Sequence, residues 1–319
     1  MNRTARVPVT ILTGFLGAGK TTLLQRILAD PQGMRIGVLV NDFGAINVDA
    51  DLIAESTGES VSLQNGCVCC SIRDDMIGAI AGLLDREPAP DRIVIEASGV
   101  SRPLPIADAL DDDALSDRTA LDGIFCLIDG EGFGSLDFAA TELAIEQAAG
   151  SDVVLLNKTD IASEAALAAI EATLAGPIPR LRLIRTIEGD LPRALLFDTA
   201  FDRTDRPSGH AAHHHDHGAH HDHDHEFSTW SWSHEGTVDM SRLRSAMRRL
   251  PHDVLRVKGI LRAPMGGRIV LQGVGKRIRI TPEADAALPA RSSVVAIGRP
   301  GTLEENWLSD LLGPCGVDA

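Results

Sequence analysis

Apolar residues in the first 200 positions form short continuous runs, separated by stretches with helical spacing. The runs predict strands over 7–12, 35–40, 92–97, 123–129, 152–157 and 180–186. Apolar positions three and four apart predict helices over 23–28, 72–84, 138–149 and 163–174. Because the runs are continuous rather than alternating, we expect helices on both faces of the sheet. This order predicts an α/β domain, built on a doubly wound, mostly parallel sheet and spanning residues 1–198.

The pattern of apolar and polar residues changes after residue 226. Polar and aromatic residues alternate over 228–233, which is typical of a half-exposed strand. A helix is predicted over 240–250 and another over 303–312. Further strands are predicted over 254–262, 268–271, 277–280 and 294–297. We expect a second, smaller α+β domain with an antiparallel sheet, spanning residues 227–319.

Residues 199–226 have almost nothing to bury and hold nine of the 11 histidines. This composition predicts a mobile linker between the domains. Neutral imidazoles bind Zn²⁺, Ni²⁺ and Co²⁺ near pH 7. The tract is therefore either a reservoir of weak metal sites or a solvated spacer. Its candidate ligands are His213, His214, His215 and His217.

Composition limits the classes of partner. Thirty basic against 45 acidic residues give a formal charge of −15, which repels nucleic acid. No apolar run is long enough to span a bilayer, and the N-terminus shows no signal-peptide core. We expect a cytoplasmic protein with no nucleic-acid or membrane partner. Its core should be aliphatic, because aromatic residues make up only 3% of the chain.

Residues 14–22, between the first predicted strand and helix, read G-x-x-x-x-G-K-T-T. Glycines let backbone N–H groups surround phosphate oxygens, and the helix N-terminus adds partial positive charge. Lys20 can reach the β- and γ-phosphates, and the Thr21 hydroxyl can bind Mg²⁺. A plain glycine-rich turn would not need Lys-Thr at the helix start. The predicted nucleotide contacts are Gly14, Gly17, Ala18, Gly19, Lys20, Thr21 and Thr22.

A second motif follows the predicted strand 92–97. Glu96 ends this apolar run, and Gly99 lies three residues further on. In a P-loop enzyme an acid at this place orders the water shell of Mg²⁺, and a glycine N–H senses the γ-phosphate. The usual acid is aspartate. We predict that Lys20 and Glu96 support catalysis, although the segment could also be a strand-end acid before a turn.

The motif Asn157-Lys158-Thr159-Asp160 follows another buried run. The carboxylate of Asp160 can accept from both N1–H and the exocyclic amine of guanine, and adenine offers no such pair of donors. The stem of Lys158 can cover the base, and Asn157 can brace the loop. We therefore predict that the nucleotide is GTP or GDP rather than an adenine nucleotide.

Three of the 5 cysteines lie close together, as Cys67, Cys69 and Cys70. In a reducing compartment such a cluster binds metal or does redox chemistry more often than it forms disulfides. Three thiolates leave one tetrahedral position open and favour Zn²⁺, Cu⁺ or a similarly thiophilic ion. Cys126 lies inside an apolar run, which predicts a small buried residue.

These motifs, at 14–22, 41–44, 66–70, 96–99 and 157–160, occur in an order that resembles the CobW family. That family comprises P-loop GTPases associated with metal trafficking, related to the UreG and HypB nickel chaperones. The resemblance extends to residues 227–312, which look like the family's C-terminal domain. It implies slow GTP hydrolysis coupled to metal binding at the cysteine motif. It also implies transfer of zinc or cobalt to a client metalloprotein.

One segment departs from the family pattern. The family commonly has Asn-Glu-Phe-Gly-Glu, and this chain has Asn41-Asp42-Phe43-Gly44-Ala45. Asp42 keeps a carboxylate that could bind metal, but the second acid is missing. An auxiliary metal site that uses this acid is therefore in doubt.

The leading hypothesis is a GTP-hydrolysing metallochaperone that requires Mg²⁺ and carries Zn²⁺. Because the sequence offers no evident catalytic base, we expect slow intrinsic turnover. A cobalt-handling protein of cobalamin synthesis could use the same thiolates, and Ni²⁺ would also suit the chemistry. A metal buffer or sensor with structural nucleotide is an alternative from another class. The client and the choice between monomer and homodimer stay open.

Overall fold

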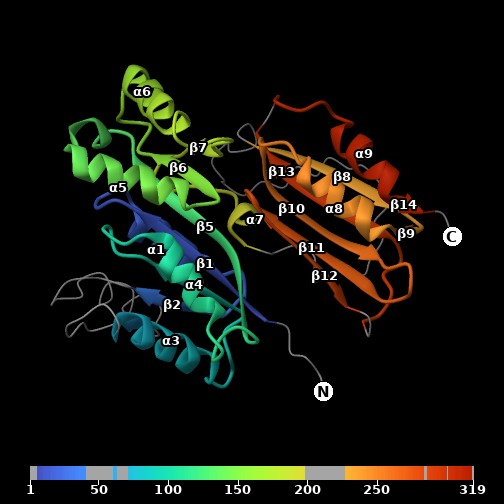
Figure 1. Cartoon of the computed structure of the whole chain (residues 1–319). Helices are drawn as coiled ribbons and strands as arrows, with labels where there is room; N and C mark the ends of the chain where they lie inside the picture. Colours follow the sequence, from blue (N-terminus) through green and yellow to red (C-terminus); the bar gives the residue numbers. More distant parts are fainter. Residues whose placement is uncertain are drawn as a thin grey trace. The chain divides into compact units, whose positions relative to one another are not determined.

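The computed structural model describes residues 6–40, 60–62, 71–197, 227–283, 286–299 and 301–317. Within the chain, residues Met1–Leu191 and Pro192–Ala319 form two compact units. Figure 1 shows a helix-flanked sheet in the first unit and a separate sheet with helices in the second. The predicted linker, residues 199–226, lies outside the described residues.

The first unit contains a seven-stranded sheet in the order β3-β2-β4-β1-β5-β6-β7. All its strand pairings are parallel, as the sequence predicted. The strands are β1 Val7–Gly14, β2 Ile36–Val40, β3 Ser60–Ser62, β4 Arg92–Glu96, β5 Thr119–Asp129, β6 Val153–Asn157 and β7 Leu183–Arg185. The helices are α1 Lys20–Ala29, α3 Ser71–Leu84, α4 Pro103–Asp108, α5 Phe138–Ala149 and α6 Glu164–Ala175. Short 3-10 turns cover Ala109–Asp111 (η1) and Phe133–Ser135 (η2).

Every residue of β4 and β6 is buried, so both faces of the sheet are covered, as the continuous apolar runs predicted. Two clusters of buried apolar residues form core in the described part of this unit. One packs α3 and α4 against β1, β2 and β4. The other packs α5 and α6 against β5 and β6. Because parallel strands end at a common edge, the segments that follow β1, β4 and β6 lie together there.

A buried ion pair crosses this sheet between two strands that flank β1. Arg92 in β4 donates to Asp122 in β5 at 2.7 Å, and the side chains are only 3% and 7% exposed. Asp122 occupies the point where the register between β1 and β5 shifts. Such an irregularity redirects a side chain, which explains how Asp122 reaches Arg92 from two strands away.

The second unit contains a five-stranded sheet in the order β12-β11-β10-β13-β8, and its strand pairings are antiparallel, as predicted. The strands are β8 Ser228–His234, β10 Val254–Arg262, β11 Arg268–Val274, β12 Arg277–Glu283 and β13 Ser292–Gly298. Helices α8 Met240–Arg248 and α9 Trp307–Leu312 pack on one face (Figure 1). A small pair joins β9 Thr237–Val238 to β14 Gly316–Val317, after the turn η3 Gly313–Cys315.

The opposite face of this sheet receives the short helix α7 Arg193–Leu196. The buried Arg256 donates to the carbonyl of Leu195 at 2.8 Å. The buried Lys258 donates to the carbonyl of Phe197 at 3.3 Å. Cationic donors that are buried need acceptors, and these carbonyls supply them. Residues 192–197 therefore belong with the second unit.

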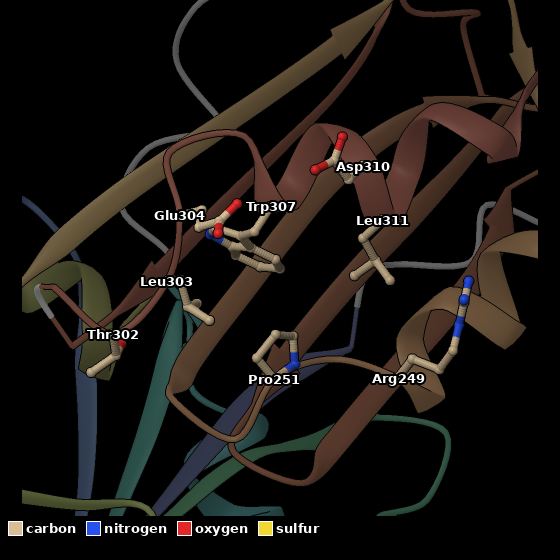
Figure 2. Close-up of a pocket in the computed structure, with 8 residues that line it drawn as sticks. All are labelled: Arg249, Pro251, Thr302, Leu303, Glu304, Trp307, Asp310 and Leu311. Carbon is tan, nitrogen blue, oxygen red and sulfur yellow. The ribbon is translucent and has the colours of Figure 1, made fainter.

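The second unit also has a hollow of about 460 Å³ between the end of α8 and the start of α9. Figure 2 shows that apolar side chains, among them Leu303, Trp307 and Leu311, line it together with the charged Arg249, Glu304 and Asp310. Trp307 packs edge-on against Trp230 of β8, with ring centroids 5.5 Å apart. None of the motifs predicted from the sequence falls in this hollow.

Candidate nucleotide site

The loop between β1 and α1 has the backbone needed to surround an anion. Gly17 and Gly19 have φ angles of 78° and 100°, which favour glycine. A Cβ at Gly17 would meet nothing within 4 Å, so this loop borders open space. Gly19 begins α1 without a side-chain cap, which leaves the first N–H groups of the helix for a ligand. The loop therefore fits a phosphate group.

Gly14 allows the start of the loop to pack closely against β5. Its φ is 133°, and a Cβ there would overlap the Leu127 carbonyl of β5. Ala18 is fully buried at the base of the loop, and Thr22 is exposed on α1. The loop is thus seated directly on the neighbouring strand, which fixes its position at the carboxyl edge of the sheet.

Lys20 lies at the base of this loop and is 7% exposed. Its Nζ donates to the carbonyls of Gly14 at 3.0 Å and Phe15 at 3.2 Å. The ammonium group is therefore held within the loop that would surround the phosphates. A cation in a protected position of this kind stabilises phosphate charge more strongly than an exposed lysine would.

Thr21 and Glu96 meet across the edge of the sheet. The Thr21 hydroxyl donates to Glu96 Oε1 at 2.7 Å, and Glu96 is 5% exposed. The two residues come together because β1 and β4 are neighbours, with Leu12 level with Glu96. A hydroxyl and a carboxylate oxygen are the ligands that Mg²⁺ prefers, so this pair fits the predicted ion.

Gly99 lies against the same loop. A Cβ on Gly99 would lie only 2.8 Å from the amide nitrogen of Leu16, so no other residue fits there without movement. The predicted phosphate sensor is therefore next to the phosphate loop.

Asn157 at the end of β6 connects two segments that are far apart in the sequence. Its Nδ2 donates to the Ala18 carbonyl at 2.9 Å. Its Oδ1 accepts from the Thr186 hydroxyl at 3.2 Å and from the Gly189 amide at 2.9 Å. The sequence predicted that Asn157 braces a loop, but it gave no sign of Thr186 or Gly189. Their loop follows β7 at the same sheet edge, which is the signal that could have indicated them.

We expect Asn157→Ala to lower the free energy of unfolding by about 2 kcal/mol, because it leaves buried backbone groups of Ala18 and Gly189 without their partner. Urea denaturation measures this change. Asn157→Asp keeps the acceptors for Thr186 and Gly189, but it buries a negative charge and turns an oxygen toward the Ala18 carbonyl. We therefore expect a loss at least as large as that of Asn157→Ala. No loss in either variant would contradict the bracing role.

Lys158 and Asp160, the residues predicted to contact the guanine base, follow Asn157 after the end of β6. Lys158 Nζ donates to Asp129 Oδ2 at 2.8 Å, and Asp160 is exposed. Partial burial alone would raise the pKa of Asp129. The hydrogen bonds from Lys158 and from the amides of Gly132 and Glu131 outweigh burial and hold this pKa below its ordinary value. Asp129 therefore stays ionised at neutral pH and holds the lysine in place. It is a further residue that the sequence did not indicate.

The predicted metal ligands of the cysteine motif, Cys67, Cys69 and Cys70, lie outside the described residues, as do Asp42 and the histidines at 213–217. Among the residues that the structure does describe, no group of three or more His, Cys, Asp or Glu is placed to hold a metal ion. Cys126 is fully buried, as predicted, and burial raises the pKa of its thiol to about 12. Burial also raises the pKa of Cys315. These two thiols are therefore poor metal ligands.

The parallel strand order, the glycine loop with its lysine and the strand-end acid define a P-loop nucleotide-binding protein. The chain belongs to the CobW/HypB/UreG family, whose nucleotide-binding domain matches residues 8–183. Residues 227–316 match the cobalamin synthesis protein cobW C-terminal domain. Both assignments confirm the resemblance that the motifs suggested. Among the described residues, no helix has the length and apolar character needed to cross a bilayer.

Several characterised relatives are similar over much of the chain. A zinc chaperone CobW from a Sinorhizobium species is 32% identical, with 86% of each chain covered. A zinc chaperone CobW from Pseudomonas aeruginosa is 33% identical, covering 87% of this chain and 83% of the relative. A zinc-regulated GTPase metalloprotein activator 1 from Schizosaccharomyces pombe is 38% identical, covering 58% of this chain and 47% of the relative.

Proposed function

We propose that this protein is a GTP-hydrolysing metallochaperone that binds Zn²⁺ at Cys67, Cys69 and Cys70 and transfers it to a client protein. The observation that carries the nucleotide part is the 2.7 Å hydrogen bond between Thr21 and Glu96, beside the Lys20 ammonium. It joins the phosphate loop to the strand-end acid, and these are the two parts that a magnesium–triphosphate site needs.

Each residue of the site has a separate task in hydrolysis. Lys20 exchanges its carbonyl partners for phosphate oxygens and stabilises the charge that develops during transfer. Thr21 and Glu96 would hold Mg²⁺, directly or through its water shell, and the ion would neutralise further charge on the phosphates. The Gly99 amide binds the γ-phosphate, and Asp160 reads the guanine edge.

The metal part of the proposal rests on the family and on the thiolate motif. Two relatives that cover most of the chain are named zinc chaperones, and three closely spaced thiolates suit this ion. The cysteines fall in the sequence between the phosphate loop and Glu96. A γ-phosphate that orders this part of the chain would change the metal affinity, and hydrolysis would then release the ion.

Zn²⁺ affinity measured with GDP and with a non-hydrolysable GTP analogue tests this coupling. We expect the two affinities to differ by about tenfold or more, which lies within the usual range of allosteric coupling. Cys67→Ala, Cys69→Ala and Cys70→Ala should each weaken binding and reduce this difference. Cys315→Ala is the matched control and should leave both affinities unchanged, because this thiol is buried in the second unit.

Equal Zn²⁺ affinities in the two nucleotide states would contradict coupling. Unchanged affinities in all three cysteine variants would contradict the site itself. Parallel titrations with Co²⁺ and Ni²⁺ identify the preferred cargo, and tighter binding of Co²⁺ would favour a cobalt-handling protein.

A further inference from the structure

One buried polar side chain has a role that the nucleotide contacts above do not explain. Gln147 lies on α5 and is 0% exposed, next to Ala148, which is 1% exposed. Burying a carboxamide is unfavourable unless it is hydrogen-bonded, so its partners indicate what it does.

Gln147 uses its donor atom on the loop that follows β4. Its Nε2 donates to the Gly99 carbonyl at 3.1 Å and to the Ser101 carbonyl at 3.0 Å. Within the described part of the chain, its Oε1 has no hydrogen-bond partner. An unpaired buried acceptor is costly, so this side chain is arranged to serve the two carbonyls and not its own acceptor.

Other contacts hold the same loop on α5. Arg102 donates to Glu146, the residue before Gln147, at 2.6 Å. Pro103 at the start of α4 lies so close to Gly150 that a Cβ there would be 2.9 Å from Pro103 Cγ. Three residues at the end of α5, Glu146, Gln147 and Gly150, therefore contact this loop or the start of α4. Of these three, Gln147 is the one that donates to Gly99.

The loop is held on α5 on one side and meets the phosphate loop on the other. Gly99 packs against the backbone of Leu16, as described above. Glycine is the residue with the greatest backbone freedom, and fixing its carbonyl removes much of that freedom. The carbonyl belongs to the peptide plane after Gly99 and the N–H to the plane before it, so the hydrogen bond from Gln147 restrains the N–H together with the packing of Gly99 on Leu16. Because these restraints are established during folding, the Gly99 N–H loses less entropy when a phosphate binds.

We propose that Gln147 is a positioning residue that sets the preference of the site for the triphosphate over the diphosphate. It orients the Gly99 amide for the γ-phosphate, which GDP lacks. This inference rests on the proposed function, in which Gly99 contacts only the γ-phosphate. It assigns α5 a part in recognising the nucleotide state, although α5 contains none of the sequence motifs.

The test compares the affinities of the full-length protein for GDP and for a non-hydrolysable GTP analogue, both with Mg²⁺. Gln147→Glu keeps the shape but replaces the donor with an oxygen that repels the two carbonyls. Gln147→Met keeps the length and removes all hydrogen bonding, and it serves if the glutamate variant does not fold. We expect affinity for the analogue to fall about tenfold and GDP affinity to change less than twofold. Gln25→Glu, an exposed change on α1, is the matched control and should alter neither affinity.

An unchanged ratio of the two affinities in the folded variants would overturn this inference and leave the proposed function standing. An equal loss for both nucleotides would also overturn it, since that is the effect of a purely structural residue. Wild-type protein that binds neither guanine nucleotide would refute the proposed function, and this inference with it.

Discussion

Replacing Lys20 with alanine should lower the maximal rate of GTP hydrolysis by about 10²–10³-fold, the usual cost of removing one preorganised donor from a transition state. Lys20 is buried in the phosphate loop, where its Nζ lies 3.0 Å from the Gly14 carbonyl. Its charge therefore acts in a protected environment, and water cannot replace it fully. Phosphate release at saturating GTP and Mg²⁺ measures the rate.

Two further variants make this prediction specific. Lys20→Arg keeps the charge, but a planar guanidinium does not fit the compact position between two loop carbonyls, so we expect a loss close to that of Lys20→Ala. Lys276→Ala changes an exposed lysine of the second unit and should keep the rate within about twofold. A Lys20→Ala protein that retains more than about a tenth of the wild-type rate would refute the catalytic role.

The second large effect concerns stability. We expect Asp122→Ala to lower the free energy of unfolding by about 3–5 kcal/mol, because it leaves the buried charge of Arg92 without its carboxylate. The pair lies inside the sheet, with side chains 3% and 7% exposed, so water cannot take the place of the lost partner. Urea denaturation followed by far-ultraviolet circular dichroism measures the change.

The same measurement on two further variants tests whether the loss comes from an uncompensated buried charge or from the loss of any ion pair. In the double variant Arg92→Met/Asp122→Leu, the loss should be much smaller, because no buried charge remains. Asp117→Ala removes an exposed pair with Arg6, whose side chains are 42% and 91% exposed, and should cost less than about 1 kcal/mol. If Asp122→Ala costs no more than Asp117→Ala, the proposed importance of burial is wrong.

Most elements could be predicted because their pattern is local. Helix α5 has the bounds that its apolar spacing predicted, and β6 differs by one residue. The last helix was predicted over 303–312 but begins only at Trp307. Leu303 fits the helical spacing, yet it lies in the preceding loop, where it lines the hollow beside α9. Apolar spacing shows which residues are buried and not where a helix starts.

Short elements were missed for a related reason. Strand β3 has three residues and helix α4 has six, so neither contains two full periods of its apolar pattern. The strand predicted over 180–186 is shorter, at Leu183–Arg185, and β5 begins earlier than predicted, at Thr119. Tertiary pairing decides such ends, and composition does not record it.

Some residues of the candidate site could be predicted from local sequence patterns, and others could not. Lys20, Thr21 and Glu96 were predictable because their motifs follow strands that end at one edge of the sheet. Asp129 also ends a buried strand at this edge, and the same rule could have indicated it. Gln147 could not be predicted as a partner of Gly99, because no local pattern relates residues that far apart. A buried glutamine within an apolar stripe is at most a sign that some partner exists.

The edge-on contact between Trp230 and Trp307 has a practical consequence. These residues and Trp232 are the 3 tryptophans of the chain, which has no tyrosine, and all of them lie in the second unit. Intrinsic tryptophan fluorescence therefore reports on the second unit alone, and the nucleotide-binding unit gives no tryptophan signal. A tryptophan introduced at Phe138, which is 85% exposed at the start of α5, would give the first unit its own signal. Comparing this variant with the parent protein would then separate the unfolding of the first unit from that of the second.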